Sequence, residues 1–277
     1  MNSTPKAVKI ENIVPERDMG KTFALEARGI GIDFGGLTAV DEFSIGVGPT
    51  EICGLIGPNG AGKTTIFNLL TNVYKPTRGE ILIGGKKTAG KSTHEVNRMG
   101  IARTFQNIRL FSKMTVIENV KVALSNSIKC SVPESMLRLP RFFASEKEMT
   151  ERALELLGVF GMQHMANWVA GSLPYGAQRR LEIVRALATN PKILLLDEPA
   201  AGMNPSETSE LMETIRQIRD QFQIAIMLIE HDMNLVMGIC EGICVLNFGK
   251  VIAKGSPEDI QSNPVVIEAY LGKKKEG

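Results

Sequence analysis

The chain has 277 residues, of which 43% are hydrophobic and 22% are charged, so it is long enough to bury an ample core in one large domain. Its 32 basic and 30 acidic residues give a formal net charge of +2, and this balance does not favour nucleic acid as the main partner. The longest uninterrupted apolar run, residues 224–229, is far shorter than the ~20 residues that cross a bilayer, which argues against a membrane-spanning chain.

Three segments are expected along the chain. Residues 1–22 are polar and lack the apolar stretch of a secretory signal, so we expect a mobile N-terminal arm. One large domain is expected over residues 23–272, and residues 273–277 are expected to form a basic tail.

The chain contains four cysteines. We place Cys53 and Cys244 in buried strands, Cys240 in a helix-like segment and Cys130 in a loop. Although Cys240 and Cys244 are four residues apart, no histidine or further cysteine completes a metal-binding set around them. We therefore interpret the cysteines as small core residues of a reduced, cytoplasmic protein.

The first strands are expected in residues 23–50, where apolar and polar residues alternate and turn residues recur, a pattern typical of short antiparallel strands. Residues 51–56 then form an apolar run that predicts a buried strand, and residues 80–83 predict another strand before a glycine pair. Further apolar strand candidates follow at residues 101–105, 193–196, 224–229 and 243–246.

Helices are expected between the later strands. One is well marked, because Asn204 can cap it, Pro205 suits its first turn and Glu207 completes the capping-box spacing. Residues 107–175 show helical patterns and no clear strand, which predicts a helical insertion of about 107–176. Apolar strands that alternate with amphipathic helices favour a mostly parallel sheet covered on both faces, and hence an α/β fold.

A glycine-rich segment follows the strand expected at residues 51–56. It reads Gly57-Pro58-Asn59-Gly60-Ala61-Gly62-Lys63-Thr64-Thr65, which matches G-x-x-x-x-G-K-[ST] between a strand and a helix. Glycines let backbone N–H groups approach an anion closely, and the helix N-terminus adds unpaired donors. Lys63 supplies a charge for the outer phosphates of a nucleotide, and the Thr64 hydroxyl suits Mg²⁺. The alternative interpretation is a glycine-rich tight turn without a ligand.

Two acids end the strand expected at residues 193–196. Asp197 stands at the strand tip, where it can hold Mg²⁺ directly or through water. Glu198 points differently, so it can accept a proton from a water that attacks the γ-phosphate. The alternative is a solvated strand end with no catalytic role.

Two further polar side chains follow strands of the same expected sheet. His231 ends the strand that we expect beside the Asp197 strand, where an imidazole can donate a hydrogen bond to the γ-phosphate. Gln106 follows residues 101–105, where a neutral amide can ligate Mg²⁺ or orient water. The alternatives are a structural histidine and an ordinary glutamine at a strand end.

These motifs, in this order, resemble the ATP-binding subunits of ABC transporters over residues 25–272. The resemblance implies a RecA-like P-loop ATPase core with an antiparallel β subdomain and a helical subdomain. It implies that Gln106 forms the glutamine loop, that residues 201–204 form the aspartate-type loop and that His231 is the switch histidine. It also implies that Phe34 stacks on the adenine of ATP.

The family signature Leu-Ser-Gly-Gly-Gln corresponds to residues 173–177, and this chain departs from it. Pro174 replaces the serine and Ala177 the glutamine, and Asn204 replaces the usual aspartate of the later loop. In the family the signature reaches the γ-phosphate on the other subunit of a dimer. The resemblance therefore leaves Gly176, backbone N–H groups and the helix N-terminus for that contact.

Several strings are similar to the subunits that serve branched-chain amino-acid importers. They are residues 103–106, 109–111, 114–120, 175–176, 179–183, 199–205, 230–233 and 269–272. Lipopolysaccharide-export and urea-import ATPases share several of these strings, so those transporters remain alternatives.

The resemblance implies a motor subunit that binds ATP and Mg²⁺ and closes on a second ATP-binding subunit, identical or homologous. Two membrane permease subunits would supply the pore and a substrate-binding protein would act indirectly, which places the chain peripherally at the cytoplasmic face of the inner membrane. Three other classes stay open: a soluble ABC ATPase acting on DNA or ribosomes, a P-loop kinase for a small molecule, and a binding subunit that closes on ATP without hydrolysing it.

Overall fold

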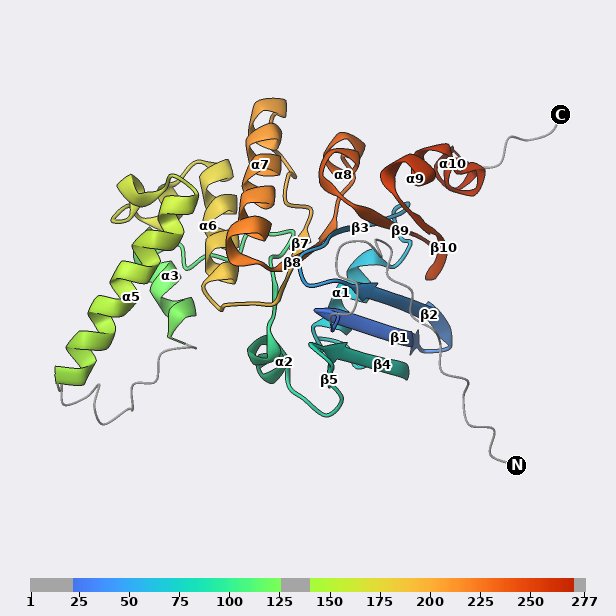
Figure 1. Cartoon of the computed structure of the whole chain (residues 1–277), viewed down its shortest axis with the longest axis horizontal. Helices are drawn as coiled ribbons and strands as arrows, with labels where there is room; N and C mark the ends of the chain where they lie inside the picture. The colour runs from blue at the N-terminus through green and yellow to red at the C-terminus, as the bar shows by residue number, and fades with distance from the viewer. Residues whose placement is uncertain (1–21, 126–139, 272–277) are drawn as a thin grey trace.

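The computed structural model describes residues 22–125 and 140–271 (Figure 1). The predicted arm, apart from residue 22, the predicted basic tail and Cys130 lie outside the described residues. Within the described part, helices lie around a six-stranded sheet, and a second sheet of four strands lies at the lower right of Figure 1.

The six-stranded sheet has the order β10-β9-β3-β8-β7-β6. Its strands are β3 (Ile52–Ile56), β6 (Ile101–Arg103), β7 (Ile193–Asp197), β8 (Ala225–Ile229), β9 (Gly242–Asn247) and β10 (Lys250–Gly255). All neighbours pair in parallel except β10, which runs antiparallel to β9 at the edge. The expected mostly parallel sheet is confirmed, and β8 lies beside β7, as the His231 prediction required.

Both faces of this sheet are buried. Because successive side chains of a strand point to opposite faces, β3 sends Ile52 and Ile56 into one apolar cluster and Cys53 and Leu55 into another. The first cluster also contains the helices of the insertion, and the second contains the first helix and the antiparallel sheet. A sheet covered on two sides explains why its strands read as unbroken apolar runs.

The four-stranded sheet is antiparallel, with the order β2-β1-β4-β5. Its strands are β1 (Leu25–Phe34), β2 (Leu37–Val47), β4 (Arg78–Ile83) and β5 (Lys86–Lys87). The antiparallel pairing expected for residues 23–50 is confirmed, but these strands are not short, since β1 has 10 residues and β2 has 11.

Five of the helices described below begin at a residue whose side chain caps them, namely α2, α3, α7, α8 and α9, whereas α1 and α6 begin without a side-chain cap. Asn204 accepts a hydrogen bond from the Glu207 N–H in the predicted capping box, and Thr115 caps its helix through Glu118 in the same way. The helices are α1 (Lys63–Leu70), α2 (Thr93–Met99), α3 (Val116–Leu124), α5 (Pro140–Val159), α6 (Tyr175–Leu187), α7 (Pro205–Phe222), α8 (Met233–Ile239), α9 (Pro257–Ser262) and α10 (Pro264–Leu271).

The regular elements in the described residues of the predicted insertion are helices, joined by loops and one isolated antiparallel bridge between Thr115 and Val169. The helices are α3, α5 and two short 3-10 helices, Gln163–Met165 and Ala170–Ser172, and together with α6 these elements occupy the left part of Figure 1. Across the described residues, no helix combines the length and apolar character needed to cross a bilayer.

Candidate functional site

Four parallel strands deliver polar residues to the same edge of the sheet. The loops after β3, β6, β7 and β8 meet there and surround a cavity of about 480 Å³. Its walls are formed by Asn59, Gly60, Ala61, Gly62, Lys63, Thr64, Thr65, Gln106, Glu198 and His231. The structure therefore brings together most of the residues that the motifs singled out.

The glycine-rich loop keeps a shape that only glycine allows at two positions. Gly57 has φ +152°, and a Cβ there would lie 2.1 Å from the carbonyl oxygen of Leu246. Gly62 has φ +102°, and its Cβ would lie 3.1 Å from the carbonyl oxygen of Ala39. Close backbone packing thus fixes the loop before the first turn of α1.

Lys63 begins α1 and points back across the loop. Its Nζ donates hydrogen bonds to the carbonyl oxygens of Gly57 at 2.6 Å and Pro58 at 3.1 Å. Burial lowers the pKa of Lys63, and the nearby carboxylates of Glu198 and Asp197 oppose this shift. A buried ammonium held at the mouth of the loop is suited to an anionic ligand.

Glu198 lies between two of the predicted partners. Its Oε2 accepts a hydrogen bond from Gln106 Nε2 at 2.8 Å, and its Oε1 lies 2.7 Å from His231 Nε2. The backbone of Glu198 has φ +48°, a left-handed conformation that costs a non-glycine residue about 1–3 kcal/mol. The side chain is 17% exposed and that of His231 is 47% exposed, so both remain accessible from the cavity.

Glu230 supports this arrangement, although it was not among the predicted site residues. Its buried carboxylate accepts the N–H of Ala200 at 2.8 Å and the N–H of His231 at 2.9 Å. The two bonds join the loop after Glu198 to the loop that carries His231. In the sequence, Glu230 stands next to His231 and belongs to the family-like string of residues 230–233, which was the only signal for it.

Asp197 is placed differently from its predicted neighbours. It is buried, and its Oδ2 lies 2.7 Å from Arg103 Nη2, while Arg103 Nη1 donates to Asn68 Oδ1 at 2.6 Å. Asp197 is absent from the cavity wall, whereas Thr64 and Gln106 belong to it. The predicted ligand set for Mg²⁺ is therefore divided into two wall residues and one acid paired with arginine.

The oxygen donors in the wall fit a hard cation. Because Gln106 binds Glu198 through its amide nitrogen, its amide oxygen is not used in that bond, and Thr64 adds a hydroxyl. Among the described residues, no group of three or more His, Cys, Asp or Glu side chains could hold a metal.

Phe34 and Gly176 lie outside the cavity wall. Phe34 is exposed at the end of β1, and its ring meets Tyr74 edge-on, with centroids 5.3 Å apart and planes at 74°. Gly176 lies in the first turn of α6, where a Cβ would be 3.2 Å from Glu207 Oε1. Their predicted roles, adenine stacking and contact with a second subunit's nucleotide, stay predictions.

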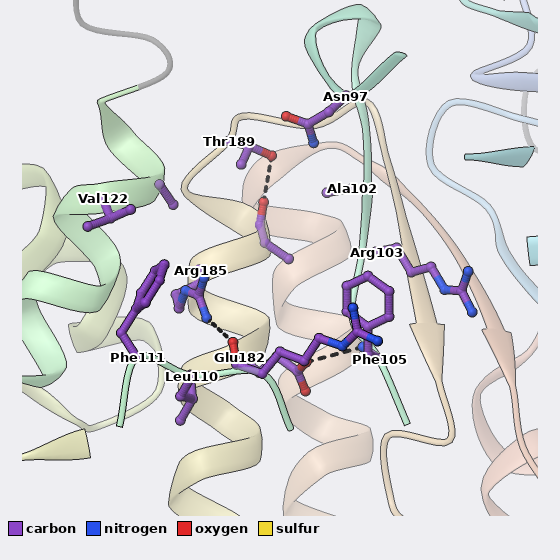
Figure 2. Close-up of a pocket in the computed structure, with 13 residues that line it drawn as sticks. Asn97, Ala102, Arg103, Phe105, Leu110, Phe111, Val122, Glu182, Arg185 and Thr189 are labelled. Atoms are coloured by element: carbon purple, nitrogen blue, oxygen red, sulfur yellow. Dashed lines mark hydrogen bonds between the residues drawn. The ribbon is translucent and has the colours of Figure 1, made fainter. Parts of the chain in front are cut away.

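A second, larger cavity lies beside the loop that follows β6. This groove has a volume of about 590 Å³ and lies between α3, α6 and the segment from β6 to Phe111 (Figure 2). Arg109 stacks on Phe105, with its guanidinium carbon 4.2 Å from the ring centroid, and Arg185 stacks on Phe111 at 4.9 Å. Burial lowers the pKa of Arg185, and Glu182 opposes that shift.

Comparison with known proteins identifies the family. The model for the ABC transporter family matches residues 40–201, and a model described as branched-chain amino acid ATP-binding cassette transporter matches residues 250–276. The chain belongs to the ABC transporter family, as one of its nucleotide-binding ATPases.

The curated relatives include proteins named for branched-chain amino-acid transport. The "High-affinity branched-chain amino acid transport ATP-binding protein LivG" of Escherichia coli (strain K12) is 50% identical over 248 residues, which cover 90% of this chain and 97% of the relative. The corresponding protein BraF of Pseudomonas aeruginosa is 46% identical over the same shares of the two chains.

Solved structures agree with the fold. A nucleotide-free ATP-binding cassette from an ABC transporter matches with a TM-score of 0.79 at 30% identity, covering 91% of this chain and 100% of that chain. The ADP conformation of an ABC transporter cassette matches with a TM-score of 0.78 at 30% identity, covering 91% and 99%. The predicted family, α/β fold class and ATPase class are confirmed, while the domain boundaries and the roles of individual residues stay predictions.

Proposed function

We propose that this chain is the ATP-hydrolysing motor of an importer for branched-chain amino acids. The observation that carries the proposal is the position of the Glu198 carboxylate, between Gln106 and His231 at the mouth of the glycine-rich loop. The relatives named for branched-chain amino-acid transport support the choice of solute.

Each wall residue has a task in hydrolysis. The loop N–H groups and Lys63 bind the β- and γ-phosphates, exchanging the internal carbonyl partners of Lys63 for phosphate oxygens. Glu198 accepts a proton from the attacking water, and His231 donates a hydrogen bond to the γ-phosphate. Bound Mg²⁺ would neutralise phosphate charge, with Thr64 and Gln106 as ligands in the wall.

Asp197 has an indirect part in this proposal. Its pairing with Arg103 holds the carboxylate at the end of β7, behind the wall, so it would act on bound Mg²⁺ through water. Phe34 stacks on the adenine, and the exposed position of its ring is compatible with that task.

The working unit is a pair of ATP-binding subunits with two permease subunits and, indirectly, a substrate-binding protein. Gly176 and the N–H groups at the start of α6 contact the γ-phosphate bound by the second subunit. Because ADP lacks that phosphate, hydrolysis removes the contact and allows the pair to open. The permease holds the chain at the cytoplasmic face of the cell membrane.

The groove is the docking site for a permease segment. Within the described part of the chain neither Arg109 nor Arg185 forms an ion pair, although Arg185 donates a hydrogen bond to the carbonyl oxygen of Arg109. Both guanidinium groups lie on aromatic rings. A short helical segment with an acidic side chain complements these charges and the apolar part of the wall. The groove adjoins the Gln106 loop, so docking there transmits movement to the nucleotide cavity.

Reconstitution tests the proposal. The chain is purified from membranes with its permease subunits and second ATPase, placed in proteoliposomes and supplied with the cognate binding protein. We expect ATP-dependent uptake of radiolabelled leucine or isoleucine, and no uptake when Glu198→Gln replaces the chain. Transport of urea alone, or movement of lipopolysaccharide outward, would overturn the choice of solute and leave the motor role intact.

A further inference from the structure

Arg179 lies behind the nucleotide cavity and has no part in the chemistry described above. It belongs to α6, three residues after Gly176, and it is the largest fully buried side chain of the described residues. A buried guanidinium is expensive to desolvate unless its donors are satisfied, so its partners indicate what it holds in place.

The two partners of one nitrogen are informative. Arg179 Nη2 donates to the carbonyl oxygen of Gln106 at 3.0 Å and to that of Glu198 at 2.9 Å. These are the two residues whose side chains bind each other in the cavity wall. Gln106 and Glu198 are therefore joined twice: by their side chains at the cavity wall, and through Arg179 by their backbone carbonyls in the buried interior.

The other nitrogen fixes the same loop to α6. Arg179 Nη1 donates to the carbonyl oxygen of Phe105 and to Glu182 Oε2, which lies 3.0 Å away. Glu182 Oε1 in turn accepts the N–H of Phe105 at 3.2 Å. The Arg179–Glu182 pair therefore grips both the N–H and the carbonyl of Phe105, just before Gln106.

We propose that Arg179 is a positioning residue for hydrolysis, which sets the separation of Gln106 and Glu198 and attaches both to α6. The left-handed backbone of Glu198 is strained and must be held by its surroundings. Two hydrogen bonds hold it, because its carbonyl oxygen accepts from Arg179 and from the N–H of Ala201. The inference rests on the proposed role of Glu198 as the base.

The arrangement has a consequence for coupling. Gly176 and Arg179 share the first turns of α6, so a shift of the signature segment moves the anchor of Gln106 and Glu198 in the same chain. Contact of the signature with the second subunit's nucleotide then adjusts the subunit's own catalytic geometry. In the proposed pair, α6 thus links the two nucleotide sites.

The test replaces the buried pair as a unit. Arg179→Met alone leaves Glu182 buried without its cation, so Arg179→Met/Glu182→Met is the main variant and thermal unfolding confirms that it folds. Arg180→Met is the matched control, since Arg180 is the next residue, is partly exposed and faces Glu210 at 3.5 Å. Steady-state phosphate release gives kcat and KM, and fluorescent ATP gives the Kd.

We expect the double variant to lose about 10²-fold in kcat, the scale of a misplaced catalytic group, with a nucleotide Kd within about threefold of the unaltered protein. Because Arg179 acts through Gln106, adding Gln106→Ala to the double variant should lower kcat little further. A folded double variant with nearly unchanged kcat, or effects of the two changes that multiply, would overturn the positioning role.

Glu198→Gln, measured in the same assay, separates this inference from the proposed function. If Glu198→Gln abolishes turnover while the double variant does not, only the Arg179 role fails. If Glu198→Gln turns over normally, the proposed base is wrong and the Arg179 role falls with it.

Discussion

The nucleotide cavity and the groove are neighbours that share the loop after β6, yet they are built in different ways. The cavity is shaped by backbone: glycines with positive φ, strand ends and a strained Glu198. The groove is shaped by side chains, namely arginines stacked on phenylalanines between helices. A backbone-built site keeps its geometry for chemistry, whereas a side-chain-built groove can adapt to a partner, and the loop with Gln106 connects them.

The largest expected effect breaks the chemistry of the cavity and leaves its shape. Glu198→Gln keeps both hydrogen-bonding positions, so ATP binding should be retained while kcat falls about 10²–10⁴-fold, the scale of lost base catalysis. Phosphate release and a fluorescent-ATP titration measure the two quantities on the same preparation. Normal turnover in this variant would remove Glu198 from the mechanism.

A smaller effect is expected on binding. Lys63→Ala removes the ammonium at the loop, so the nucleotide Kd should rise about 10–100-fold, as for the loss of one or two charge-assisted hydrogen bonds. The measurement is an equilibrium titration with fluorescent ATP. Lys87→Ala, on the antiparallel sheet, is the matched control, and an equal effect of both changes would contradict a specific role for Lys63.

Charge reversal in the groove should weaken permease binding and leave hydrolysis intact. Arg109→Glu should weaken association with the detergent-solubilised permease about tenfold, as expected for an unfavourable charge contact, while hydrolysis by the isolated subunit stays near normal. Pull-down with increasing permease concentration measures the association, and phosphate release measures hydrolysis. If Arg109→Glu and the unaltered chain bound the permease with equal affinity, the groove would not be the docking site.

The smallest effect concerns the helix that walls the groove. Thr115→Ala removes the N-cap of α3, so the free energy of unfolding should fall by about 1 kcal/mol, measured by urea denaturation at neutral pH.

The same cap has a pH dependence. The Thr115 N–H and hydroxyl, both bonded to Glu118, hold the pKa of that carboxyl below its ordinary value of 4.5. The stabilisation is therefore present above pH 4.5 and is lost as the pH falls through the lowered pKa. The difference in unfolding free energy between Thr115→Ala and the unaltered chain should therefore shrink in acid. A difference that stays constant with pH would contradict the reciprocal cap.

The sequence was informative where function is encoded locally. The glycine-rich loop, the Asp-Glu strand end and the capped helix at Asn204 could all be read from neighbouring residues, because each depends on a short spacing. The parallel order of β7 and β8 also followed from apolar runs.

The remaining parts of the site depend on contacts between distant segments. Arg103 and Arg179 appear in the sequence only as parts of family-like strings, yet one pairs with Asp197 and the other binds the carbonyls of Gln106 and Glu198. Such contacts are set by tertiary packing, so no local sequence pattern predicts them.

The proposed mechanism of hydrolysis depends most on where the terminal phosphate of ATP lies. A crystal structure of Glu198→Gln with Mg²⁺ and ATP addresses this directly, because the variant should hold its substrate. We expect the γ-phosphate above Lys63, within hydrogen-bonding distance of His231, and a water between it and residue 198. A triphosphate bound away from His231 and residue 198 would contradict the account.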